Sequence, residues 1–225
     1  MQSSKSSRLY LFNQVLNRRL LQRWLKPLTH LGALLPLAVL IWDALTNNLT
    51  INPIQAATQR TGRIALTILL LSLSCTPLAS VLGFKEALKL RRPLGLYAFL
   101  YASLHFLIFF GLDYGLNLQL VAAELREKRY IIAGFSAGVI LALLASTSFQ
   151  YWMKRLGKNW KRLHRLVYLA GLLAVVHYAW AVKADIRLPL LYGAILILLL
   201  LMRLSVIKRT ASILWQKLVR RVNQT

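Results

Sequence analysis

Long apolar stretches alternate along the chain with short stretches that hold most of the charged residues. Six of the apolar stretches approach the ~20 residues that a helix needs to cross a hydrocarbon core about 30 Å thick. They are Leu28–Thr46, Ile64–Gly83, Pro93–Leu112, Ile131–Phe149, Leu163–Val182 and Leu188–Leu204. Backbone groups in lipid must be paired within their own segment, so the pattern predicts an all-α bundle of six transmembrane helices.

The two ends of the chain follow a different pattern. Arg8–Leu25 and Ser205–Val222 mix Leu and Trp with basic residues at helical spacing, which is typical of helices that lie in the membrane interface. We therefore expect an amphipathic N-terminal segment (1–27), a six-helix transmembrane domain (28–204) and an amphipathic tail (205–225), with no internal repeat. Pro27 is expected in the first turn of the first span, where its missing N–H costs little.

The distribution of charge predicts the orientation of the chain. Its formal net charge is +23, and 22 of its 29 Lys and Arg residues lie before the first span, in the second-to-third and fourth-to-fifth loops, or after the last span. Five of the six acidic residues lie at or beyond the opposite ends. By the positive-inside rule, both termini are cytoplasmic. Because the basic residues lie at helix ends, we expect them to meet anionic lipid rather than nucleic acid.

The chain has only four histidines, His30, His105, His164 and His177. An ionisable side chain within a span is costly to bury, so each is a candidate functional residue; the alternative is a neutral ring bonded to a neighbouring helix. At 1.5 Å per residue, His105 lies about 18 Å beyond Pro93. His177 lies about 20 Å beyond His164 on a parallel helix. The spacing predicts an outer pair, His105 and His177, and an inner level that holds His30 and His164.

Small side chains share the helix face of each outer histidine. They are Gly95, Ala98 and Ala102 on the third span, and Ala170, Ala174 and Ala181 on the fifth. Space beside two imidazoles suits a flat macrocycle whose iron takes one ring nitrogen from each side. The fourth span carries a similar stripe, from Gly134 to Ala145, without a histidine, so ordinary helix packing is the alternative.

The ligand chemistry favours haem over other metals. Zinc would require three or four converging ligands, and the membrane-depth positions contain no Asp or Glu. Two axial imidazoles leave no open position on the iron, which favours electron transfer over oxygen chemistry. We expect the free ring N–H groups of His105 and His177 to bond the carbonyls four residues earlier, at Tyr101 and Leu173.

Four segments resemble a known family. They are HLGALLPL (30–37), TGRIALTILLLSLSCTPLA (61–79), RRPLGLYAFLYASLH (91–105) and RLGKNWKRLHRLVYLAGLLAVVHYAW (155–180). Together they closely resemble the MsrQ (YedZ) family of haem-binding membrane subunits, within the ferric-reductase-like transmembrane group that includes the NADPH oxidases. The resemblance covers about residues 28–204.

This resemblance implies a six-helix cytochrome of the bacterial inner membrane, with heme b and FMN as cofactors. It implies that electrons pass from quinol, or from a cytoplasmic flavin reductase, to a periplasmic molybdopterin-containing methionine-sulfoxide reductase. That catalytic subunit is the implied partner in a heterodimer, and it repairs oxidised envelope proteins. The chain itself would be an electron-transfer subunit rather than the catalytic one.

The resemblance also implies roles for particular residues. His105, His164 and His177 match the haem-linked histidines of the family, and His30 matches a position of less defined role. The wider group has two histidines on its third helix; here Arg92 lies near the level of the inner one, so a count of one haem or two stays open.

Three arginines are further candidates. Arg91 and Arg92 are placed to pair with haem propionates or a flavin phosphate, or serve only as positive-inside residues. Arg63, at the outer start of the second span, is placed to pair with an outer propionate or the partner, or to extend toward the lipid interface.

Two other functions are compatible with the sequence. One is a ferric or cupric reductase that acts directly on metal at the outer face. The other is a haem-free membrane assembly or transport protein that uses its histidines for interhelical hydrogen bonds or proton relay.

Overall fold

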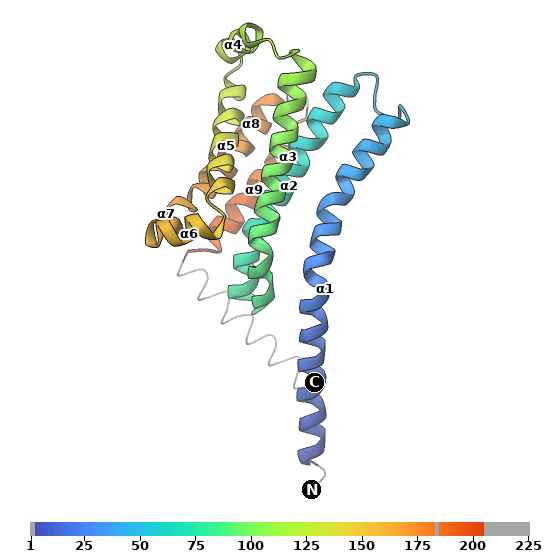
Figure 1. Ribbon diagram of the computed structural model, residues 1–225, viewed down its shortest axis with the longest axis vertical. Helices are drawn as coiled ribbons and strands as arrows, with labels where there is room; N and C mark the ends of the chain where they lie inside the picture. The colour runs from blue at the N-terminus through green and yellow to red at the C-terminus, as the bar shows by residue number, and fades with distance from the viewer. Residues whose placement is uncertain (1–2, 183–184, 205–225) are drawn as a thin grey trace.

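The computed structural model describes residues 3–182 and 185–204, with side chains described from residue 23 onward. These residues form helices and connecting turns, with no strand among them, so the all-α prediction is confirmed. The elements are α1 (Ser3–Leu45), α2 (Pro53–Val81), the 3₁₀ turn η1 (Lys85–Leu90), α3 (Arg91–Leu107), the π-helical η2 (Ile108–Asp113), α4 (Leu118–Glu127), α5 (Arg129–Ser146), α6 (Gln150–Leu156), α7 (Lys158–Leu163), α8 (Leu166–Ala181) and α9 (Arg187–Leu201). Figure 1 shows their arrangement as a bundle of roughly parallel and antiparallel helices.

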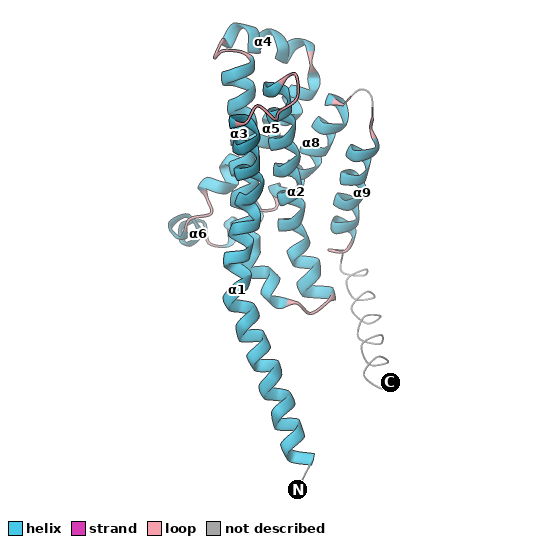
Figure 2. Ribbon diagram, turned by 90° about the vertical axis from the view of Figure 1, so that its right-hand side faces the viewer, coloured by secondary structure: helices cyan, strands magenta, loops and turns pink. Residues whose placement is uncertain are grey.

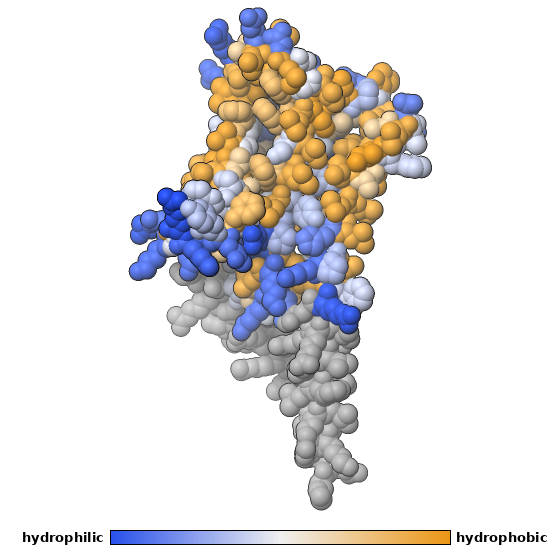
Figure 3. All heavy atoms as spheres, viewed as in Figure 1, coloured by the Kyte–Doolittle hydropathy of each residue, from blue (hydrophilic) through white to orange (hydrophobic). Residues whose placement is uncertain are grey.

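Five of the described segments are long and apolar enough to cross a membrane. They are Arg23–Leu45, Pro53–Val81, Lys85–Asp113, Arg129–Ser146 and Lys158–Ala181. The surface in Figure 3 has an apolar belt with hydrophilic groups above and below it. The chain is therefore a multi-pass membrane protein. The sixth predicted span corresponds to α9, which is apolar but shorter, with 15 residues, so a sixth crossing stays a prediction.

Two predicted helix boundaries were wrong. α1 is continuous from Ser3 to Leu45 and contains Pro27 and Pro36 in its interior, whereas we had expected a helix to start at Pro27. Within lipid, continuing the helix past a proline leaves fewer backbone groups unpaired than stopping there. α2 begins at Pro53, well before the predicted Ile64. The predicted tail helix, Ser205–Val222, lies outside the described residues.

α2 is the central helix of the bundle and packs against α1, α3, α8 and α9. Its Leu69 and Leu73 are almost completely buried. One buried cluster joins α2 to α1, α3, α5 and α8, and a second joins it to α8 and α9. α5 lies on the side of the bundle away from α1 and packs mainly on α8 (Figures 1 and 2). Apolar packing around α2 thus holds α3 and α8 in one bundle.

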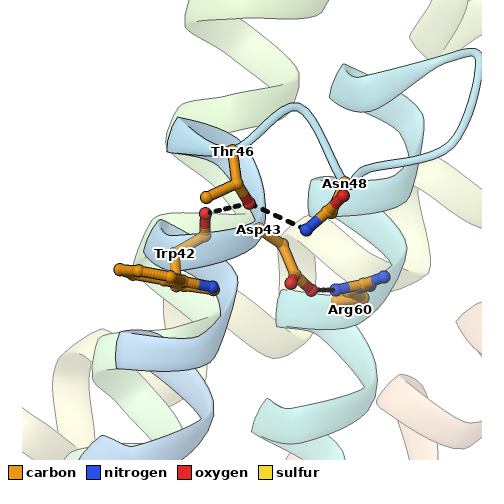
Figure 4. A network of polar contacts seen from close by, with 5 residues as sticks. All are labelled: Trp42, Asp43, Thr46, Asn48 and Arg60. Atoms are coloured by element: carbon orange, nitrogen blue, oxygen red, sulfur yellow. Dashed lines mark hydrogen bonds and ion pairs between the residues drawn. The ribbon is translucent and has the colours of Figure 1, made fainter.

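Polar contacts attach α1, whose outer face is exposed, to the rest of the bundle. The hydroxyl of the fully buried Tyr101 on α3 donates to the Ala33 carbonyl at 2.7 Å. Near the opposite end of the helix, Asp43 forms an ion pair with Arg60 on α2. Figure 4 shows this pair beside a cap in which Asn48 donates to the Thr46 hydroxyl at 3.0 Å. α1 is therefore held against α2 and α3 by a few specific bonds.

Candidate functional site

The structure brings the predicted outer histidines together. His105 on α3 and His177 on α8 have ring centroids 6.0 Å apart, and their planes are nearly perpendicular, at 83°. His164 lies in the turn between α7 and α8 rather than on the α8 helix that carries His177. The rings of His105 and His177 are both partly buried between the helices. The two residues form the histidine pair discussed below.

Each ring of the histidine pair is oriented by a hydrogen bond to a neighbouring helix. His105 Nδ1 lies 2.8 Å from the Thr58 carbonyl on α2, and His177 Nδ1 lies 2.7 Å from the Tyr130 carbonyl on α5. A carbonyl can only accept, so Nδ1 carries the proton in both rings and Nε2 carries the lone pair. That tautomer presents Nε2 for binding a metal.

These bonds correct our expectation that the rings would bond the carbonyls of Tyr101 and Leu173. The carbonyls of Thr58 and Tyr130 lie on other helices, α2 and α5, so each of these bonds joins two helices. The carbonyls of Thr58 and Tyr130 are reached instead because the neighbouring helix approaches closely at each point.

A glycine creates each close approach. A Cβ added at Gly62 on α2 would lie 2.9 Å from His105 Nδ1, and one at Gly134 on α5 would lie 2.5 Å from His177 Nδ1. Both distances are shorter than real Cβ contacts. Gly134 was expected to belong to a packing stripe unrelated to the histidines, and this was wrong: it packs directly against an imidazole. Ala98 and Ala170 of the predicted stripes are completely buried, so at these positions the stripes serve helix packing.

The geometry of the histidine pair suits one metal ion between two imidazoles. Metal–nitrogen bonds of about 2 Å, with about 1.1 Å from each nitrogen to its ring centre, would place the centroids about 6 Å apart. The 6.0 Å observed matches this separation. Among the described residues, no group of three or more His, Cys, Asp and Glu side chains is arranged to hold a metal. The donor set is therefore two neutral imidazoles.

The two inner histidines have separate partners. His164, in the turn before α8, stacks on Trp160 with centroids 4.0 Å apart, and its Nε2 lies 3.2 Å from the Thr147 hydroxyl. His30 on α1 hydrogen-bonds the Tyr97 hydroxyl through Nδ1 at 2.9 Å. In the described part of the chain, no hydrogen bond or ring contact joins His30 to His164. Whether either one binds a cofactor stays a prediction.

The three candidate arginines have exposed side chains, and Arg63 lies ten residues beyond Pro53, inside α2 rather than at its start. Arg91 and Arg92 begin α3, and Arg63 lies on α2 next to Gly62. Within residues 3–182 and 185–204, none of their guanidinium groups forms an ion pair. The backbone of Arg91 is held by Ser72, whose hydroxyl donates to its carbonyl at 2.9 Å. Their proposed roles with propionates or phosphate are untested by the structure.

Arg203, which the sequence places among the basic residues of the tail, connects three helices. Arg203, just after α9, donates to the Tyr168 hydroxyl and to the Leu73 carbonyl. Its guanidinium also lies 4.8 Å from the centre of the Tyr168 ring. Arg203 therefore joins α9 to α2 and α8, and no local sequence signal distinguished it from its basic neighbours.

Comparison with known proteins identifies the family. The profile described as "Ferric reductase like transmembrane component" matches residues 61–175. A Bordetella pertussis protein named "Protein-methionine-sulfoxide reductase heme-binding subunit MsrQ" is 43% identical over 178 residues, covering 78% of this chain and 86% of the relative. A protein of the same name from Xanthomonas euvesicatoria pv. vesicatoria is 44% identical over 181 residues, covering 78% and 83%. The chain therefore belongs to the ferric reductase like transmembrane component family and, within it, to the MsrQ proteins.

Proposed function

We propose that this chain is the haem-binding membrane subunit of a bacterial methionine-sulfoxide reductase system, and that a heme b held by His105 and His177 carries electrons across the membrane. The observation that carries this proposal is the 6.0 Å separation of the two rings, each with Nδ1 bonded away from the other. The printed names of the MsrQ relatives support the same function.

The chain's own residues have defined roles in this proposal. When bound, haem supplies iron that changes reversibly between the ferric and ferrous states. His105 and His177 would each bind the iron through Nε2, while the carbonyls of Thr58 and Tyr130 hold the rings and increase their basicity. Two imidazole ligands would leave the iron no open position for oxygen, so the site suits electron transfer rather than oxygen chemistry.

The charge distribution supports the orientation of the chain in this proposal. With both termini cytoplasmic and α9 as a sixth crossing, the basic ends of α3 and α8 face the cytoplasm of a bacterium and the histidine pair lies nearer the periplasm. Electrons would enter from quinol or a cytoplasmic flavin reductase. They would leave to a periplasmic molybdopterin-containing reductase subunit, which reduces methionine sulfoxide in oxidised envelope proteins.

The inner level supplies candidate sites for the remaining cofactors. Arg91 and Arg92 are exposed there and suit the propionates of haem or the phosphate of FMN. His164 is a candidate ligand for a second haem, and His30 a further contact at that level. On the outer side, Arg63 suits a propionate or the partner subunit.

The experiment that tests this function is visible spectroscopy of the purified protein and its histidine variants. His105→Ala and His177→Ala are each expected to lose the absorbance bands of reduced haem. Tyr192→Phe, which removes only a hydrogen bond to Thr67 between α2 and α9, is the matched control and should keep them. Normal haem content in both histidine variants would refute the assignment.

One observation favours a second function, direct reduction of external metal, because the matching family profile is named for ferric reductases. Ferric or cupric reduction at the outer face needs no partner protein. Purified chain in liposomes, reduced from the inside, should therefore reduce an external ferric chelate if this function holds. Reduction of the chelate only after the periplasmic subunit is added would exclude it.

A further inference from the structure

The hairpin α2–α3 and the pair α5–α8 are built to the same plan. In each, a histidine on the second helix bonds a carbonyl on the first helix, and the carbonyl precedes the histidine by 47 residues in both cases. A glycine follows each carbonyl by one helical turn, Gly62 after Thr58 and Gly134 after Tyr130. A shift of 72 residues thus places all three features of one hairpin on those of the other.

Buried residues are related by the same shift of 72 positions. The pairs related by 72 residues include Ala65 and Ala137, Leu69 and Leu141, and Ala98 and Ala170, all of which are buried. Our expectation of a chain without an internal repeat was therefore wrong. The repeat is hidden in the sequence because apolar spans resemble one another at many shifts. The paired hydrogen bonds single out one of these shifts.

The glycine in each copy is required by helix geometry. A helical carbonyl points toward the residue four positions later and accepts its N–H, so a ring from another helix must pass over that residue to reach the same oxygen. A side chain there would block it. At Gly134 an added Cβ would lie 2.5 Å from Nδ1 and 2.7 Å from Cε1 of His177, and at Gly62 the corresponding distances to His105 are 2.9 and 3.0 Å.

We propose that Gly62 and Gly134 are positioning residues of the haem site, which let each Nδ1–H reach its carbonyl and so direct each Nε2 toward the shared iron. The haem part of this inference rests on the proposed function. The hydrogen bond also makes each imidazole a stronger donor, which stabilises ferric over ferrous iron. Loss of either bond therefore raises the midpoint potential of the haem.

Alanine substitution at three glycines tests this inference. Gly62→Ala and Gly134→Ala are expected to lose haem or to raise its midpoint potential, with the larger effect at Gly134, where the clash is closer. Gly138→Ala is the matched control, because it lies one turn further along α5 with nothing within 4 Å of its added Cβ, and it should match the wild type. If both test variants match the control in haem content and potential, the inference is overturned.

A double-mutant cycle tests the contact itself without relying on haem. Gly134→Ala should lower the melting temperature, or the amount of folded protein, in the wild-type background but not in a His177→Ala background, where the clashing ring is absent. A Gly134→Ala chain that fails to accumulate should accumulate again in the double variant. Equal losses in both backgrounds would overturn the inference. A wild-type chain without haem would instead refute the proposed function, and this cycle would still decide the positioning role.

Discussion

Replacing Tyr101 with phenylalanine removes one hydroxyl from the interface between α1 and α3. The side chain is fully buried, and its hydroxyl donates to the Ala33 carbonyl at 2.7 Å. Phenylalanine fills nearly the same volume, so no cavity forms and the contribution of packing to the free energy of unfolding should not change. What is lost is a single neutral hydrogen bond. The carbonyl is a helical one on α1 and keeps its intrahelical partner.

The expected cost is therefore small. A typical intramolecular hydrogen bond contributes about 1 kcal/mol, and interhelical bonds in membrane proteins average about 0.6 kcal/mol. Tyr101→Phe should lower the free energy of unfolding by about 0.6–1 kcal/mol. Tyr97→Phe, which loses a bond to the exposed His30, should cost less because water or lipid headgroups can replace its partner.

Equilibrium unfolding of the purified protein in mixed detergent micelles measures this difference. Protease sensitivity of α1 gives a local readout of the same contact. A loss of more than about 3 kcal/mol for Tyr101→Phe would contradict the reasoning, since a single neutral hydrogen bond cannot supply it. A larger loss of stability for Tyr97→Phe than for Tyr101→Phe would contradict the argument that the more buried hydrogen bond contributes more.

The remaining predictions concern two ion pairs, Asp43 with Arg60 and Glu124 with Lys128. Asp43→Asn should remove the ion pair with Arg60 and reduce stability by at most about 1 kcal/mol. Because salt screens partly exposed charges, the difference in melting temperature between this variant and the wild type should shrink at high salt. A difference that salt leaves unchanged would contradict an ionic origin. On α4, the hydrogen bond from Lys128 holds the pKa of Glu124 below its ordinary value. Its contribution to stability is therefore present above the ordinary glutamate pKa of about 4.3 and is lost as the pH falls through the lowered value. Melting temperatures of wild type and Glu124→Gln should converge on acidification, and a gap that widens would reverse the sign of this argument.

Some features of the fold and site could be read from local patterns. Hydropathy along the chain gave the helical class and the approximate position of each span, because lipid requires every backbone group to be paired within its own helix. The depth of His105 and His177 followed from counting residues at a fixed rise per residue. The same patterns missed the first turns of α2, from Pro53 to Ile64, where polar residues interrupt the apolar run.

The amino-acid sequence by itself determined that this chain is helical, that it belongs in a membrane and that two histidines lie at one depth. These properties depend on residue spacing and on transfer from water to lipid, which are local. Only the tertiary structure decided which carbonyl each ring reaches and which glycine admits it, since these contacts join residues 47 and 43 positions apart on different helices. A glycine in a span looks the same whether it packs against an alkyl chain or an imidazole, and the packing of neighbouring helices makes the difference.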